Sequence, residues 1–179
     1  MIGRMSKKKN YKELLTTPYE TGIKNFSSIA KFYQYYAPCI DSAQTSGCFD
    51  DTKSEEVFKS MLKVNALESK TRILKRLQPA SWKKDGFDTD ILDFEESKIL
   101  CDKFNNESEL HALLRHIRNS LAHGYIYVWR KRKGDFIFLV DFDSNKHKQT
   151  ENKPKPTAKI MVSMPILERW KEIIESEIV

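Results

Sequence analysis

Apolar residues recur at intervals of three and four through much of the chain, a spacing that is typical of helices with one buried face. Ile29, Phe32 and Tyr36 form one such set. Where this spacing holds we expect helices, over residues 23–36, 54–77 (as one long helix or two short ones), 92–104, 106–123 and 165–178. Residues 78–90 contain Pro79 and Gly86 and are expected to form a loop.

After Gly124 the pattern changes from a helical to an alternating one. We therefore expect three strands, over residues 125–132, 135–142 and 158–164. A turn at Gly134 joins the first two, and a loop rich in lysine and proline over residues 143–157 joins the last two. These elements predict a mainly α fold, a helical bundle in which a small three-stranded antiparallel sheet is inserted before the C-terminal helix.

The composition fits one globular domain over residues 1–179, with a basic tail over residues 1–10. Hydrophobic residues make up 40% and charged residues 31% of the chain, and no run approaches the roughly 18 apolar residues that span a membrane. The start lacks the apolar segment of a secretory signal, and the three cysteines lack metal-ligand spacing, so we expect a reducing cytoplasm. The net charge of +6 permits binding to a polyanion without demonstrating it.

Residues 110–123 carry the most informative pattern. At about 100° per residue, five apolar side chains share one face of the helix: Leu110, Leu113, Leu114, Ile117 and Leu121. On the polar face, Arg115, Asn119 and His123 form a row, and Arg118 lies beside it at the border with the apolar face. Gly124 fits the position after the helix, where φ is usually positive.

An arginine and a histidine therefore converge at the end of one helix. Histidine exchanges protons near neutral pH, and the guanidinium of arginine matches the geometry of phosphate. Together with Asn119 as an orienting group, Arg118 and His123 are the parts needed for phosphodiester cleavage. The alternative is that His123 only complements the negative end of the helix dipole.

The segment RNSLAHG, Arg118–Gly124, resembles the Arg-x4-6-His signature of the HEPN superfamily (higher eukaryotes and prokaryotes nucleotide-binding domains). Asn119 stands where many members have Asn, Asp or His, and the run His123-Gly124-Tyr125 resembles their His-x-Tyr continuation. The strands expected after the motif are similar to the bacterial, plasmid- and defence-associated branches. The resemblance implies a HEPN-type up-and-down bundle.

The same resemblance implies a metal-independent endoribonuclease without a cofactor. His123 would act as general base or acid, Arg118 would hold the scissile phosphate, and Asn119 would orient the arginine or a phosphate oxygen. The implied products are a 2′,3′-cyclic phosphate and a 5′-hydroxyl. The implied biological setting is that of a toxin–antitoxin pair or an abortive-infection effector in antiviral (phage) defence.

The implied partners are RNA, a second copy that completes a composite active site in a homodimer, and an antitoxin or nucleotidyltransferase. A nucleotidyltransferase would modify Tyr125, which otherwise has a structural role. The alternative function is a non-catalytic RNA-binding or protein-interaction module on the same fold. A DNA-binding regulator ranks last, because no helix-turn-helix is recognisable.

Three further features are ambiguous. Arg115 and His116 either support the catalytic residues or contact RNA, or they are plain solvated charges. An aromatic residue and four basic residues near the first turn either bind RNA or keep a strand edge soluble: Trp129, Arg130, Lys131, Arg132 and Lys133. Six acidic residues within 85–96 suggest helix caps more strongly than a metal site, so we expect no metal.

Overall fold

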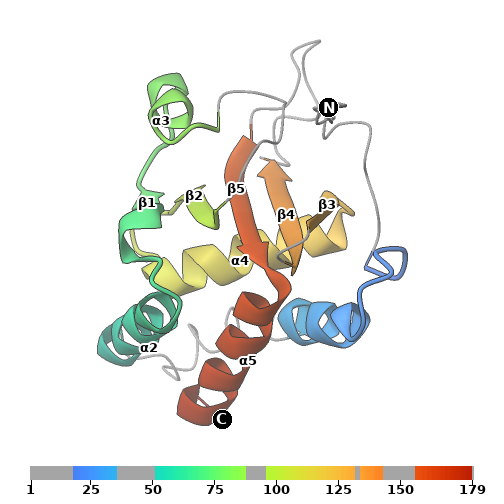
Figure 1. Ribbon diagram of the computed structural model, residues 1–179. Coiled ribbons are helices and arrows are strands. Elements are labelled where there is room, and N and C mark those ends of the chain that lie inside the picture. The colour runs from blue at the N-terminus through green and yellow to red at the C-terminus, as the bar shows by residue number, and fades with distance from the viewer. Residues whose placement is uncertain (1–17, 36–50, 88–95, 132–133, 143–155, 179) are drawn as a thin grey trace.

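A computed structural model describes residues 18–35, 51–87, 96–131, 134–142 and 156–178 (Figure 1). The helices are residues 26–35, α2 (Asp51–Val64), α3 (Pro79–Lys84), α4 (Glu109–Ala122) and α5 (Met164–Ile178), with a 3-10 turn η2 at Glu68–Lys70. The strands are β1 (Thr71–Leu74), β2 (Lys98–Asp102), β3 (Ile126–Lys131), β4 (Gly134–Phe142) and β5 (Pro156–Ser163). The basic tail expected over residues 1–10 lies outside the described residues.

The five strands form one sheet in the order β1-β2-β5-β4-β3. β1 pairs with β2 in parallel, and the other three pairs are antiparallel. Helix α4 crosses one face of the sheet from the β1 side to the β3 side, and α2 and α5 pack on that same side (Figure 1). Because side chains alternate between the two faces of a strand, each central strand contributes to two apolar clusters.

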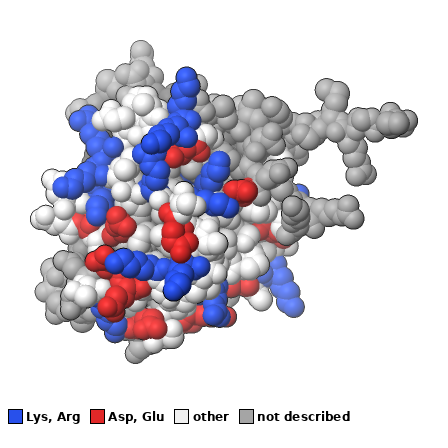
Figure 2. All heavy atoms as spheres, turned by 60° about the vertical axis from the view of Figure 1, so that its left-hand side comes forward, with Lys and Arg blue, Asp and Glu red and all other residues white. Residues whose placement is uncertain are grey.

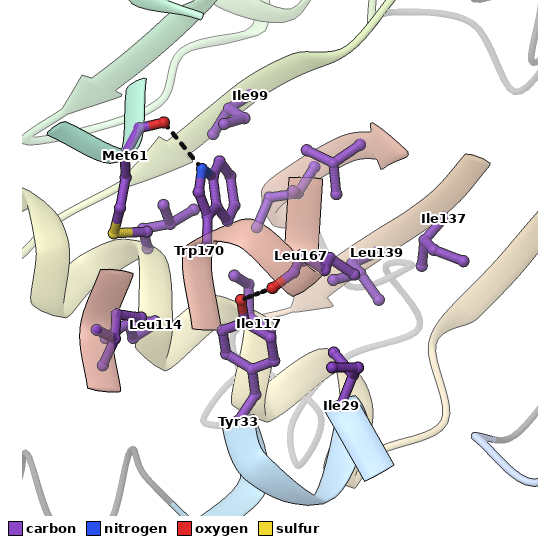
Figure 3. Close-up of a cluster of buried hydrophobic side chains, with 14 of the residues drawn as sticks. Ile29, Tyr33, Met61, Ile99, Leu114, Ile117, Ile137, Leu139, Leu167 and Trp170 are labelled. Carbon is purple, nitrogen blue, oxygen red and sulfur yellow. Dashed lines mark hydrogen bonds between the residues drawn. The ribbon is translucent and has the colours of Figure 1, made fainter. Parts of the chain in front are cut away.

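The larger cluster lies between the sheet and the helices. Trp170 of α5 is fully buried there, and its indole Nε1–H donates to the carbonyl oxygen of Met61 in α2 at 3.0 Å (Figure 3). The Tyr33 hydroxyl donates to the carbonyl oxygen of Leu167 at 2.7 Å (Figure 3). Buried aromatic rings that also satisfy their polar ends fix α5 against two other helices. The C-terminal helix is therefore an integral part of the core.

The smaller cluster covers the opposite face of the sheet. Its central members are Phe138 of β4 and Phe87, whose rings stack at 6.5 Å. Trp82 of α3 packs against Phe87 edge to face. Pro79 at the first turn of α3 and a capping box between Gln78 and Ser81 start this short helix, which the sequence analysis expected to be a loop.

The predicted fold class is wrong. The protein has an α/β fold with a five-stranded mixed sheet, whereas a mainly α bundle with a three-stranded antiparallel insertion was expected. The three C-terminal strands lie where the alternating pattern put them, but β1 and β2 fall inside segments that were expected to be helices. These two extra strands, one of them paired in parallel, change the class.

Local chemistry explains both errors. Helix α2 ends at Val64 because Ala66 adopts a left-handed φ of +49°, although the apolar spacing continues to residue 77. In β2, Ile99 and Cys101 face the larger cluster while Leu100 faces the smaller one. A short strand that is buried on both faces is a continuous apolar run, and periodicity alone does not separate it from a buried helical turn.

Candidate active site

Helix α4 positions the candidate site. Ser108 caps its start, since the Ser108 hydroxyl oxygen accepts from the backbone N–H of His111 at 3.1 Å, and Glu109 lies in the first turn. The helix ends where the backbone N–H of His123 donates to the carbonyl oxygen of Asn119 and Gly124 adopts a φ of +69°. The glycine expected after the helix is confirmed.

The sheet buries part of the face that the helical wheel assigned as polar. His116 and Ser120 are fully buried, and His111 is 8% exposed. This happens because α4 lies between the other helices on one side and strands β2 and β4 on the other. The helix reaches solvent at its two ends, with Glu109 exposed in the first turn and Ala122 and His123 exposed at the C-terminal end.

His116 lies between two carboxylates from different strands. Its Nδ1 is 2.7 Å from Oδ2 of Asp141 in β4, and its Nε2 is 2.9 Å from the carbonyl oxygen of Asp102 in β2 and 3.2 Å from the Asp102 carboxylate. Burial alone would lower the pKa of His116, but the hydrogen bonds with Asp102 and Asp141 outweigh it and raise the pKa above its usual value. When both ring nitrogens carry a proton, the ring can donate to both acceptors.

The Asp141 carboxylate is also linked by hydrogen bonds to the candidate site residues Asn119 and Arg118. Asn119 Nδ2 donates to Oδ2 of Asp141 at 3.2 Å, and Arg118 Nη1 donates to Oδ1 of Asn119 at 3.0 Å. The backbone N–H of Phe142 donates to the other Asp141 oxygen at 2.9 Å. A chain of hydrogen bonds therefore connects the buried strand β4 to the guanidinium of Arg118.

Arg118, Asn119 and His123 come together at the C-terminal end of α4. Arg118 is half-buried, and within the described part of the chain the Asn119 oxygen is the acceptor found for its guanidinium. The exposed ring of His123 lies 6.2 Å from the ring of Tyr125, which contacts Phe142 edge to face at 4.8 Å. The C-terminal end of α4 thus offers a cationic donor group and, five residues further along, an exposed imidazole.

Arg115 binds chiefly to Glu107, and its Nη2 also lies 3.7 Å from the Asp102 carboxylate. Its Nε and Nη2 donate to the two carboxylate oxygens of Glu107 at 2.6 and 2.9 Å, and its guanidinium lies 4.3 Å from the centre of the Phe104 ring. Burial alone would raise the pKa of the Glu107 carboxyl, but the hydrogen bonds from Arg115 and from the Phe104 N–H outweigh it and lower the pKa. This pair fixes the start of α4.

The basic segment of β3 is only partly described. Trp129 is half-buried and packs against the smaller cluster, and Arg130 is exposed while its Nη2 donates to the carbonyl oxygen of Thr21 at 3.2 Å. Lys131 closes β3 opposite Gly134, and Arg132 and Lys133 lie outside the described residues. A role of this segment in RNA binding stays a prediction.

Acidic and basic side chains alternate on the face that carries α2 and β1 (Figure 2). Lys59 pairs with Glu55, and Lys70 pairs with Glu96. Arg72 donates to both carboxylate oxygens of Asp85 at 2.8 and 2.6 Å. The positive net charge is therefore not gathered into one broad basic surface on this side.

Two of the six acids within residues 85–96, Asp85 and Glu96, thus belong to ion pairs, and the other four lie outside the described residues. Among the residues that the structure describes, no group of three or more histidine, cysteine or carboxylate side chains is arranged to hold a metal ion. None of the described helices has the length and apolar character needed to cross a bilayer.

Sequence reasoning missed Asp141 and Asp102, although both flank the site. Asp141 stands in the run DFIFLVDF, where the alternation places it on the same face as Ile137 and Leu139. A carboxylate at an inward position of an apolar strand requires a buried partner, and a histidine on the polar face of the preceding helix is a candidate. That combination of signals was available in the sequence.

Comparison with known proteins identifies the family. The model of a protein family described as HEPN pEK499 p136 matches residues 47–176, a range that includes α4 and the sheet. No curated protein and no solved structure matches the chain. Since the family match covers well over half of the 179 residues, the chain belongs to this HEPN family.

Proposed function

We propose that the protein is a metal-independent endoribonuclease whose catalytic residues are Arg118 and His123. The observation that carries this proposal is their placement at the C-terminal end of α4, where the Asn119 oxygen accepts from Arg118 and His123 is exposed. HEPN domains are often ribonucleases, so family membership supports the same assignment. A guanidinium with donors to spare can bind a phosphate oxygen, and an exposed imidazole can exchange protons with the substrate.

The reaction follows from these roles. His123 accepts the proton of a ribose 2′-hydroxyl, and the 2′-oxygen attacks the adjacent phosphorus. The bond from phosphorus to the 5′-oxygen breaks, a 2′,3′-cyclic phosphate forms, and the leaving 5′-oxygen receives a proton from a general acid. Arg118 stabilises the negative charge that develops on the phosphoryl oxygens.

The proposal includes dimerisation because the reaction needs a general base and a general acid, and one copy of His123 provides only one of them. A second copy that presents its own Arg118 and His123 across a cleft would supply the general acid. We further propose that the protein acts as a toxin or abortive-infection effector, silenced by an antitoxin or nucleotidyltransferase. Membership of a HEPN family supports a toxin-related module, whereas the dimer and the partners rest on the resemblance of the Arg118–His123 segment to HEPN toxins.

The test is cleavage of a mixed RNA substrate in EDTA by the wild type, His123→Ala and Arg118→Ala. The wild type is expected to leave cyclic phosphate ends, and each substitution to lower the rate by about 10²–10³-fold, as loss of one charge-stabilising group typically does. Arg169→Ala is the matched control, because Arg169 is a solvent-exposed arginine of α5 that pairs with Glu172. Sedimentation of the same samples checks the dimer.

A folded wild type that binds RNA but does not cut it at any pH between 5 and 9 would contradict the ribonuclease and favour a non-catalytic RNA-binding module. Cleavage that persists in both site variants would place the chemistry elsewhere in the chain.

A further inference from the structure

A buried carboxylate stands directly behind the candidate site. Asp141 is 2% exposed, and it faces α4 from the end of β4, where the register with β5 shifts between Asp141 and Phe142. All three of its described polar contacts are with groups that can donate a hydrogen: the backbone N–H of Phe142, His116 Nδ1 and Asn119 Nδ2. An ionised carboxylate only accepts, so it suits a position surrounded by donors.

The Asn119 amide has two ends with opposite hydrogen-bonding character. Its NH2 group points to Asp141, and its oxygen therefore points to the Arg118 guanidinium. If the amide turned over, its oxygen would meet the Asp141 carboxylate and its NH2 group would meet another donor. Both contacts would then be unfavourable, so the carboxylate determines which end of the amide Arg118 meets.

The carboxylate is itself held on both oxygens. The Phe142 N–H binds Oδ1, and the fully buried His116 binds Oδ2 while its other ring nitrogen is anchored on Asp102 of β2. Two strands of the sheet, β2 and β4, thereby fix one carboxylate against one turn of α4. Rigid support of this kind from buried side chains is what a catalytic group needs to keep its position.

We propose that Asp141 is a positioning residue of the site, which orients Arg118 through the amide of Asn119 and has no contact with the substrate. This inference rests on the proposed ribonuclease function, because it assigns Arg118 the phosphate. The role predicts that loss of the carboxylate misplaces the guanidinium without removing it.

The experiment compares two buried carboxylates that both bind side chains of α4. Asp141→Asn places an NH2 group against a donor whichever way the new amide turns. Glu107→Gln is the matched control, because Glu107 is also buried but holds Arg115 instead of Arg118. Rates are measured at a temperature at which circular dichroism shows every variant to be folded.

Asp141→Asn is expected to lower kcat by about 10–10²-fold with little change in KM, a range consistent with the cost of slight misplacement of a catalytic group. Glu107→Gln is expected to lower the unfolding temperature and leave kcat near that of the wild type. Adding Asp141→Asn to Asn119→Ala is expected to cost nothing more, because both act through one link. A purely stabilising Asp141 would instead affect stability and spare kcat.

Failure of this inference differs from failure of the proposed function. If Arg118→Ala and His123→Ala are inactive while Asp141→Asn retains the wild-type kcat, the positioning role is overturned and the ribonuclease stands. If the wild type itself is inactive, proton–nitrogen NMR decides the matter, through the Asn119 side-chain amide and the Arg118 Nε–H. Both signals are expected to shift and broaden in Asp141→Asn but not in Glu107→Gln, and unchanged signals would overturn the role.

Discussion

The two ends of α4 each join a buried carboxylate to an arginine, but in different ways. At the N-terminal end, Glu107 binds Arg115 directly through both carboxylate oxygens. At the C-terminal end, Asp141 reaches Arg118 only through the neutral amide of Asn119. A direct ion pair neutralises the arginine, whereas an amide relay orients it and leaves its charge available. The first arrangement stabilises the fold and the second suits an anionic ligand.

Both arginines are partly buried, but their surroundings differ. The guanidinium of Arg115 lies against the Phe104 ring, whereas Arg118 lies close to the helix end at which Ala122 and His123 are exposed. The Arg-x4-6-His signature, Arg118 to His123, lies at the C-terminal end. Two arginines three residues apart on one helix therefore have separable roles.

The largest expected effect is the difference in cleavage rate between a variant that lacks Arg118 and one that lacks Arg115. Arg118→Ala is expected to lower the cleavage rate by about 10²–10³-fold and to change the free energy of unfolding by less than about 1 kcal/mol, because its one described bond is to a neutral amide. Arg115→Ala is expected to do the reverse, with a near-normal rate and a marked loss of stability. RNA cleavage and urea denaturation of the two variants make the measurement. Equal cleavage rates in the two variants would contradict the separate roles assigned to the two ends of α4.

The next effect concerns stability alone. Glu107→Gln leaves the guanidinium of Arg115 beside a neutral group, and breaking a buried ion pair typically costs about 3–5 kcal/mol. Since part of Arg115 reaches solvent, we expect the lower end of that range from urea denaturation. Glu55→Gln is the control, because it breaks the exposed pair with Lys59, and solvent-exposed ion pairs contribute little to stability. Similar losses in both variants would show that the Glu107 pair is no stronger than a surface pair.

The helix that carries the candidate site could be predicted from the sequence more reliably than the fold could, although the roles of the site residues stay a prediction. The spacing of Arg118 and His123, the serine cap and Gly124 are local signals, and each lies on one helix and its ends. The support of that site is not local, because Asp102 and Asp141 reach His116 across gaps of 14 and 25 residues. Strand β2 provides one of these contacts and was itself expected to be helical. Because β2 was not predicted, the burial of His116 was not expected either.

A smaller effect, on the pH dependence of stability, separates His116, which binds Asp141, from Glu107. Because the pKa of His116 is raised in the folded protein, its stabilising contribution is complete below about pH 6.5 and is lost as the pH rises through the folded pKa. The groups that face it are Asp102, Asp141 and the like-charged Arg115. The pKa of Glu107 is lowered, so its contribution is present above about pH 4.3 and is lost as the pH falls through the folded pKa.

Denaturation between pH 3 and 9 checks this prediction. His116→Gln is expected to flatten the alkaline decline, which one proton limits to about 1.4 kcal/mol per pH unit. Glu107→Gln is expected to flatten the acidic decline and keep the alkaline one. An alkaline decline of unchanged slope in His116→Gln would mean that another group titrates there.

The smallest effect tests how α4 ends beside the site. Gly124 has a φ of +69°, where a Cβ atom costs about 1 kcal/mol, so Gly124→Ala is expected to lower the free energy of unfolding by that amount. Gly124→Asn is the control, since asparagine tolerates this conformation better and is expected to lose less. Strain at Gly124 acts between His123 and Tyr125, at the open end of α4, and leaves the Glu107 pair untouched. The cleavage rate is therefore expected to fall more in Gly124→Ala than in Glu107→Gln, although Glu107→Gln is the less stable protein. The opposite order of rates would mean that activity depends on overall stability.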